Sequence, residues 1–249
     1  MALGIKLARV AIIITIFALW EALSRSGIVN PRLLPAASDT LAMLGQLLQR
    51  ASVRNDLAVT ASEVLTAFAL AVPFGALVGF LIAENRCFAE VVKPLLFFAF
   101  SIPKSIFLPM FILVFGVGFA QKVGFGFFST IFIVIMSTTT AVEQVKVEYL
   151  TVARSYGATS AQTALRVYLP SMLPVLLEAL RISMIFNLTG VILAEMYASR
   201  DGIGHQIASW GENFQMKQLL AGVVMIATIA IAFNEAVRWV ETRCSHWRT

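Results

Sequence analysis

The sequence predicts an all-α protein that crosses a membrane about six times. Hydrophobic residues make up 59% of the 249 positions and charged residues only 13%, and the mean hydropathy is +0.83. Soluble proteins carry roughly 25% charged residues, so a soluble chain of this length could not bury so much apolar surface. A transmembrane helix needs roughly 20 mostly apolar residues. Six stretches meet that requirement, at about 7–24, 57–83, 91–117, 123–142, 170–196 and 217–239.

The first of these stretches has two interpretations. Lys6 and Arg9 precede a short apolar run, Val10–Trp20, and this pattern is also typical of a cleaved secretory signal. The other interpretation is a retained helix that continues through Leu23, with Glu21 near the outer interface. We expect the retained helix.

Residues 25–56 predict a helix that lies along the membrane surface. Leu41, Leu44, Leu47 and Leu48 recur at helical spacing after Ser38, which is a plausible N-cap. One apolar face and one polar face are typical of an interfacial helix. We therefore divide the chain into an N-terminal part, 1–56, and a transmembrane domain, 57–245, which contains a cytoplasmic loop at 145–169.

Helix-breaking residues interrupt two of the expected spans. The second contains Pro73, and the third is interrupted at Ile102-Pro103-Lys104 and again at Pro109. Such breaks persist in membranes where neighbouring protein satisfies the freed backbone groups, which indicates a packed bundle with a pathway. The alternative is an ordinary kink, and for Pro73 we expect only that.

A few polar side chains inside the spans are candidates for lining a pathway, because an ionisable or polar group at membrane depth is costly. Lys104 could attract an anion, pair with an acid across the bundle, or extend to the interface. Glu195 could gate the pathway or hold an outer loop by hydrogen bonds. The full candidate set is Ser101, Lys104, Thr138, Asn187, Thr189 and Glu195. Thr138 could instead bond back to its own helix.

The basic residues give a weak orientation signal. With both ends inside, ten lie on the cytoplasmic side and seven on the outer side, which is the direction that the positive-inside rule expects. The inner set is Lys6, Arg9, Arg86, Lys93, Lys146, Arg154, Arg166, Arg238, Arg243 and Arg248; the outer set is Arg25, Arg32, Arg50, Arg54, Lys122, Arg200 and Lys217. The net charge of +5 forms no basic stripe, so we expect no nucleic-acid partner.

The stretch Glu148–Pro174 is polar, unlike the apolar runs on either side of it. Val145–Tyr156 predicts a short helix, and Gly157 should end it because glycine readily takes the left-handed cap conformation. Thr159 and Gln162 form a capping box that would start a second helix.

Two helices around a central glycine favour docking into a groove of a partner protein. Pro170 and Pro174 then mark the entry to the next span. The alternative is an amphipathic loop that rests on lipid headgroups.

This loop resembles the cytoplasmic signature of the inner-membrane permease subunits of binding-protein-dependent ABC importers. The signature has Glu-Ala-Ala, a glycine four residues after the last alanine, and a distal Leu-Pro. Here Thr151 and Val152 replace the usual glutamate and first alanine. The residues that the resemblance assigns to ATPase coupling are Thr151, Val152, Ala153, Arg154, Gly157, Ala158, Thr159, Gln162, Leu169 and Pro170.

Three further segments are similar to the branch of this family that imports nitrate, sulfonates, taurine, bicarbonate and some thiamine-precursor pyrimidines. They are Ser101–Lys104 with Leu108-Pro109 and Phe115–Gly118, Leu180-Arg181, and Ala194–Met196 with Gly202–Gly204. The resemblance covers roughly residues 30–245.

The resemblance implies a type I importer permease core (MetI-like) in a bacterial inner membrane, with both termini cytoplasmic. It implies a second permease copy, two ABC ATPase subunits and an extracytoplasmic substrate-binding protein as partners. ATP and magnesium would bind those ATPases, and we expect no cofactor on this chain. The cargo would be a small anion such as nitrate, a sulfonate, taurine or bicarbonate, or alternatively a thiamine precursor or another small organic solute.

Two other classes fit the sequence less well. A stand-alone secondary transporter predicts an inverted repeat and membrane-buried acids for ion coupling, and we find no clear repeat. An intramembrane enzyme needs a nucleophile–base or metal constellation, and none is visible. The chain also lacks a Gly-x-x-x-x-Gly-Lys-[Ser/Thr] phosphate loop, so it is not itself an ATPase of that type.

Overall fold

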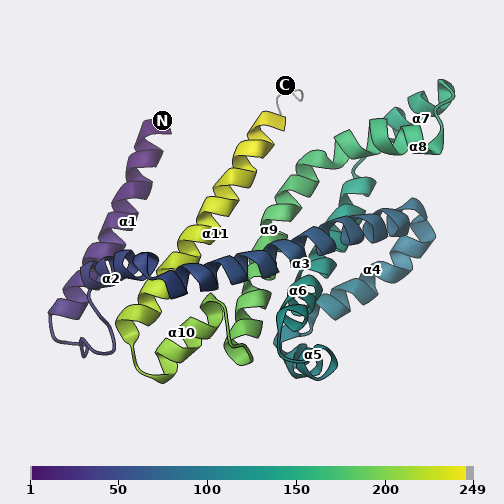
Figure 1. Cartoon of the computed structure of the whole chain (residues 1–249). Helices are drawn as coiled ribbons and strands as arrows, with labels where there is room; N and C mark the ends of the chain where they lie inside the picture. Colours follow the sequence, from purple (N-terminus) through teal and green to yellow (C-terminus); the bar gives the residue numbers. More distant parts are fainter. Residues whose placement is uncertain (1, 245–249) are drawn as a thin grey trace.

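The computed structural model describes residues 2–244, and every regular element in that range is a helix, with no strand (Figure 1). This confirms the all-α prediction. The elements are α1 (Ala2–Arg25), α2 (Ala37–Gln49), α3 (Ala51–Glu84), α4 (Arg86–Ser101), the 3₁₀ turn η1 (Lys104–Phe107), α5 (Leu108–Phe115), α6 (Phe119–Glu143), α7 (Val147–Ser155), α8 (Ser160–Thr163), the π-helical segment η2 (Ala164–Tyr168), α9 (Leu169–Tyr197), α10 (Ile203–Glu212) and α11 (Met216–Cys244).

Within the described residues, four helical stretches are long and apolar enough to cross a membrane. They are Ala51–Glu84, Phe119–Glu143, Ser160–Tyr197 and Met216–Trp239. A fifth candidate is the pair formed by α4 and the η1–α5 stretch, which is bent by 79°. These five correspond to five of the six expected spans. The sixth, 7–24, lies within the helix α1, and its place as a membrane span stays a prediction.

Helix α6 lies at the centre of the bundle and packs mainly against α3 and α9. Small residues allow the close approach that membrane helices use to pack. A Cβ atom at Gly79 of α3 would lie only 2.6 Å from the carbonyl oxygen of Ile135 in α6. Helix α3 continues through Pro73 without a break, as expected.

The third expected span is broken at Ile102 and Pro103, as the sequence indicated. Pro109 was expected to break the span a second time, and that prediction is wrong. Pro109 lies in the first turn of α5, where a missing N–H costs no helical hydrogen bond.

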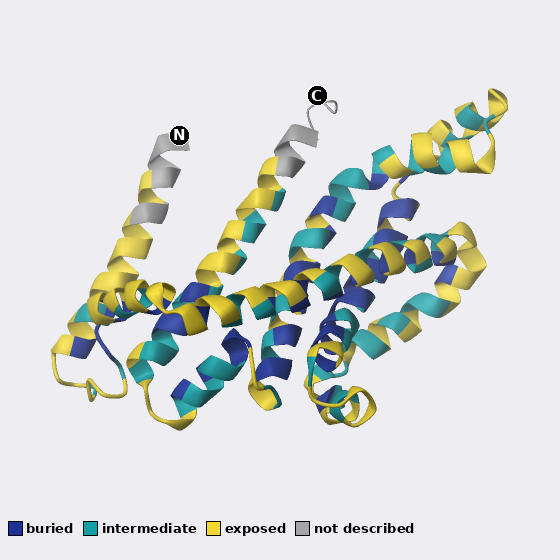
Figure 2. Cartoon of the chain, viewed as in Figure 1, coloured by how far each residue is buried: buried dark blue, intermediate teal, exposed yellow. Residues whose placement is uncertain are grey.

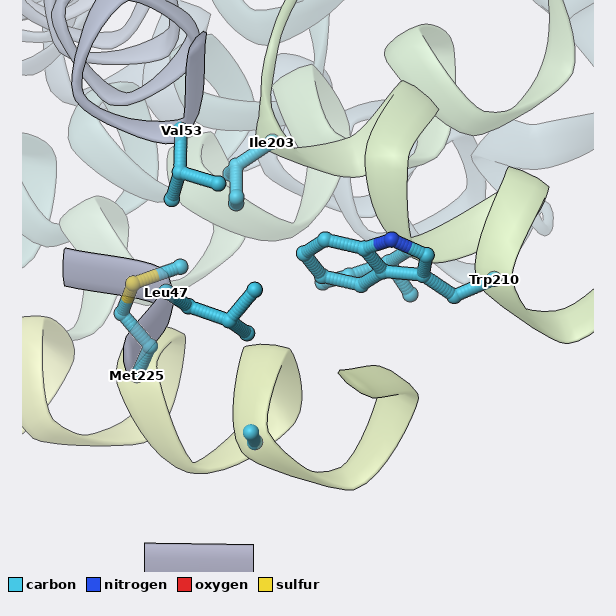
Figure 3. Close-up of a cluster of buried hydrophobic side chains, with 7 residues drawn as sticks. Leu47, Val53, Ile203, Trp210 and Met225 are labelled. Atoms are coloured by element: carbon cyan, nitrogen blue, oxygen red, sulfur yellow. The ribbon is translucent and has the colours of Figure 1, made fainter. Parts of the chain in front are cut away.

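Part of the apolar face of helix α2 packs against other helices of the chain, and part of it stays exposed. Leu47 is fully buried in a cluster with Val53, Ile203, Trp210 and Met225, which come from α3, α10 and α11 (Figure 3). The amphipathic helix is therefore present, but it does not simply rest on lipid. The boundary placed at residue 56 falls inside α3.

Ser38 is not the N-cap of α2, contrary to the sequence prediction. The N-cap is Ala36, two residues earlier, so the helix begins at Ala37, and no side chain caps it. The Ser38 hydroxyl and backbone N–H both donate to the Glu21 carboxylate, at 2.9 and 3.1 Å, and Arg25 donates to the same group. Glu21 thus joins the end of α1 to the start of α2.

Candidate functional site: the projecting loop and the polar cavity

The loop between α6 and α9 forms the helix–glycine–helix unit that the sequence predicts. Gly157 has φ +72°, the left-handed conformation that favours glycine. The Gly157 N–H donates to the Arg154 carbonyl at 2.9 Å and the Ala158 N–H to the Ala153 carbonyl at 3.0 Å. This is the bonding pattern of a Schellman cap, and it ends α7 and turns the chain.

A reciprocal capping box starts the second half of the loop. The Gln162 N–H donates to the Thr159 hydroxyl at 3.3 Å, and the Thr159 N–H donates to the Gln162 side-chain oxygen at 2.9 Å. The second helix is not separate from the span that follows, because α8, the π segment and α9 run on from Ser160 to Tyr197.

This loop projects from the body of the molecule, beyond the end of α9 (Figure 1). No residue of α7, α8 or the π segment is buried, and the loop is largely exposed in Figure 2. Tyr156 is 87% exposed and Val147 is 71% exposed. Gathered apolar and aromatic side chains on a projection are typical of a surface that binds a partner.

The ten residues assigned to coupling all lie in or at the end of this projection. Eight belong to the α7–α8 region, where Ala153 and Ala158 are half-buried and the other six are exposed; Leu169 and Pro170 form the start of α9. The Thr151 hydroxyl, at the position of the family's usual glutamate, donates to the Val147 carbonyl at 3.0 Å. The Thr151 side chain therefore bonds within α7.

A cavity of about 610 Å³ lies beside the break in the third span. Ser101, Lys104 and Thr189 all line it, so the structure brings three of the six candidate pathway residues together. The Lys104 ammonium donates to the Phe100 carbonyl at 3.2 Å and lies 4.1 Å from the centre of the Phe100 ring. The Lys104 charge thus lies in a cavity wall that is otherwise largely aromatic and apolar, and Phe186 forms another part of that wall.

The other three candidates lie in packed interfaces outside this cavity. The buried Asn187 amide donates to the Val64 carbonyl of α3 at 2.8 Å. Thr138 is buried where α6 meets α3, beside a separate cavity of about 250 Å³ that Tyr168 of the π segment also lines. These two side chains contribute to helix contacts.

Glu195 holds the loop that precedes α10. Its carboxylate accepts hydrogen bonds from the Thr60 hydroxyl at 2.6 Å and from the Gly204 N–H at 2.7 Å. The Ile203 N–H in turn donates to the Thr60 hydroxyl at 2.9 Å. Glu195 was considered either to gate the pathway or to hold an outer loop. These hydrogen bonds are the ones expected of a residue that holds the loop.

A buried ion pair near the same end of the bundle was missed by the sequence reasoning. Lys122 of α6 and Glu63 of α3 lie 2.5 Å apart with almost no exposure, and Lys122 also donates to the Ser199 hydroxyl at 3.0 Å. A cavity of about 330 Å³ adjoins the pair. Glu63 inside an apolar run was the available signal, because an acid at membrane depth needs a partner.

Among the residues whose side chains the structure describes, no three His, Cys, Asp or Glu side chains come close enough together to hold a metal ion.

Comparison with known proteins gives a consistent picture. Residues 71–246 match the family described as binding-protein-dependent transport system inner membrane component. The taurine transport system permease protein TauC of Escherichia coli is 26% identical over 248 residues, which cover 98% of this chain and 89% of that protein. The aliphatic sulfonates transport permease protein SsuC of Bacillus subtilis is 24% identical over 233 residues, which cover 94% of this chain and 84% of that protein.

A third relative is the formylaminopyrimidine transport permease protein ThiX of Halalkalibacterium halodurans. It is 26% identical over 230 residues, which cover 92% of this chain and 91% of that protein. Among solved structures, an inward-facing form of the MetNI methionine ABC transporter matches with a TM-score of 0.66 at 19% identity. The match covers 81% of this chain and 98% of that one, and it shows a shared fold.

Proposed function

This chain belongs to the family of binding-protein-dependent transport system inner membrane components, and from that premise we propose that it is the permease of an ATP-driven importer of small sulfonates. The family and the relatives are transport permeases of ABC importers. Our proposal has two parts. The first concerns the contact between this chain and the ATPase, and the second concerns the cargo.

The single observation that carries the coupling part is the exposed, well-capped loop from Val147 to Tyr168. Its backbone is fixed by a Schellman cap and a capping box, so it keeps its shape without being buried. A rigid projection loses little conformational freedom when a partner covers it, which favours tight docking. We assign the cleft of an ABC ATPase subunit as that partner.

The resulting assembly has two copies of this chain, two ATPase subunits and a substrate-binding protein on the opposite side. In it, the loop and both termini lie in the cytoplasm of a bacterial cell. Closure of the ATPases on ATP would move the two loops together and shift the bundle from an inward-facing to an outward-facing state. Such a shift requires ATP to favour one state over the other through differential contacts.

The cargo part of the proposal rests on the relatives and on the Lys104 cavity. Two of the relatives are named for taurine and for aliphatic sulfonates. A sulfonate carries a fixed negative charge, and the half-buried Lys104 ammonium offers the matching positive charge where attraction between charges is stronger than in open water. The hydroxyls of Ser101 and Thr189 lie on the same wall but donate to the Phe97 and Ile185 carbonyls of their own helices, so Lys104 is the group that attracts the anion.

A thiamine-precursor pyrimidine is the second candidate cargo. One relative is named for formylaminopyrimidine transport, and Phe100 and Phe186 line the same cavity. Aromatic side chains would stack on a flat heterocycle as they stack on each other. Competition between taurine and a pyrimidine for transport separates the two cargoes.

Co-purification with the cognate ATPase subunit tests the coupling part. Gly157→Pro forces φ to about −65° where the loop needs a positive value, so the variant should lose the ATPase while the span remains in the membrane. Gly27→Pro is the matched control, because Gly27 also has a positive φ (+73°) with open space around it, but lies in the α1–α2 connection. Equal recovery of the ATPase with both variants would contradict the proposal.

A further inference from the structure

The π segment Ala164–Tyr168 interrupts the helix that joins the projecting loop to the bundle. The Leu169 N–H donates to the Ala164 carbonyl, five residues back, whereas an α-helix would use the Leu165 carbonyl, four residues back. Regular α-helix lies on both sides, as α8 before the segment and α9 after it. The segment therefore holds one residue more than an uninterrupted α-helix would need at this place.

Pro170 stands directly after the donor that closes the π segment. The next N–H group in either register would come from residue 170, and proline has none. The N–H groups of the segment can therefore move from one carbonyl to its neighbour with no hydrogen bond to break at residue 170. Exchange between the π and α registers costs less here for this reason than it would inside a helix without proline.

A cavity of about 250 Å³ beside the segment gives its side chains room to move. Among the residues that line it are Ala164, Leu165 and Tyr168 of the segment, Ala76 of α3 and Thr138 of α6. The Thr138 side chain is only 1% exposed, and its hydroxyl has no hydrogen-bond partner among the residues that the structure describes. A buried hydroxyl without a partner is costly, which favours a second arrangement in which that hydrogen bond is made.

We propose that the π segment is a switch between two helical registers, and that closure of the ATPase subunits drives it from π to α. This inference rests on the coupling role proposed for the loop. In the α register the extra residue enters regular turns, which rotates the loop about the axis of α9 by roughly 100°, the twist of one α-helical residue. Tyr168 then turns into the cavity, where its hydroxyl donates to that of Thr138.

Distances between two spin labels test the switch. Tyr156→Cys at the exposed end of α7 and Glu84→Cys at the exposed end of α3 carry the labels, in a chain with Cys87→Ser and Cys244→Ser. The reconstituted chain alone should give two distances. The minor one should match the variant that lacks Ala164, because loss of one residue forces the α register. ATPase subunits with ATP, under conditions that block hydrolysis, should make the minor distance the major one.

Two pairs of variants keep the test independent of the deletion. Thr138→Val should lower the share of the minor distance in the chain alone about fivefold, the factor for one neutral hydrogen bond, whereas Thr138→Ser should preserve that share. Ala76→Leu should fill the cavity and abolish the minor distance. Ala69→Leu should leave it unchanged, because Ala69 is an exposed residue of α3 that does not line this cavity.

The possible results separate the switch from the coupling role of the loop. A single distance in the chain alone, unaltered by Thr138→Val and Ala76→Leu, would overturn the register switch. Two distances that respond to these variants but not to the ATPase subunits would support the switch and contradict the coupling role.

Discussion

Lys104 is the residue on which the proposed cargo most directly depends. It carries the only charge among the residues that line its cavity, and its ammonium group lies 4.1 Å from the centre of the Phe100 ring and 6.0 Å from that of Phe186. Partial burial beside these rings strengthens the attraction for an anion relative to a charge in open water, because the surrounding dielectric is lower.

Lys104→Gln should therefore raise the KM for taurine by about tenfold, the effect of one lost contact to a charged group. Initial rates of uptake into proteoliposomes at a series of taurine concentrations measure it. Lys217→Gln is the control, because that lysine pairs with Asp39 on an exposed surface. If both variants transport taurine with the same KM, Lys104 does not contact the cargo.

The Glu63–Lys122 pair makes a prediction about stability. Removing one partner leaves an unpaired buried charge, so Glu63→Leu or Lys122→Leu alone should each destabilise the bundle by about 3–5 kcal/mol. The double variant should recover most of that loss, because two apolar side chains can replace a buried ion pair. Thermal unfolding midpoints in detergent give the comparison, and additive losses in the double variant would show that the two residues do not interact.

At the scale of single elements, the loop could be predicted in most of its detail and the pathway could not. The cap at Gly157 and the capping box at Thr159 depend on residues within five positions of each other, so local rules determine them. The cavity depends on how α4, α6 and α9 are rotated against each other. Asn187 and Thr189 are two residues apart on one helix, yet only Thr189 reaches the cavity.

Contacts between residues far apart in the sequence also explain what the sequence analysis got wrong or missed. Leu47 was expected to face lipid because its spacing shows only that α2 has an apolar face, and not what covers that face. Residues of α10 and α11, more than 150 positions later, cover it. The pairing of Lys122 with Glu63 was missed because the two residues lie in different spans, about sixty positions apart in the sequence.

The capping box predicts how the loop keeps its shape. Thr159→Ala removes the acceptor for the Gln162 N–H and should destabilise the start of α8 by about 1 kcal/mol. Backbone amides of residues 160–163 should then exchange with solvent several-fold faster, which hydrogen-exchange mass spectrometry measures. Thr151→Ala, a hydroxyl in the middle of α7, should leave those amides unchanged. Unaltered exchange in Thr159→Ala would mean that the capping box does not hold the loop.

At the scale of the whole molecule, the helical core and the projecting loop have separate tasks. Helices α3, α6 and α9 form the tightly packed centre, and the loop extends from the same α9 that lines the Lys104 cavity (Figure 1). Motion of the loop is thus joined to the cavity through one continuous helical stretch, Ser160–Tyr197. The π segment in that stretch is the kind of irregular turn that often occurs at functional sites.

The measurement that tests this account most directly is uptake of radiolabelled taurine into proteoliposomes that contain this chain, its ATPase subunits and its substrate-binding protein. Uptake should require ATP on the loop side, should be lost in Gly157→Pro and should be retained in Gly27→Pro. Uptake that proceeds without the ATPase subunits, or that survives Gly157→Pro unchanged, would contradict the central claim that this loop couples ATP hydrolysis to transport.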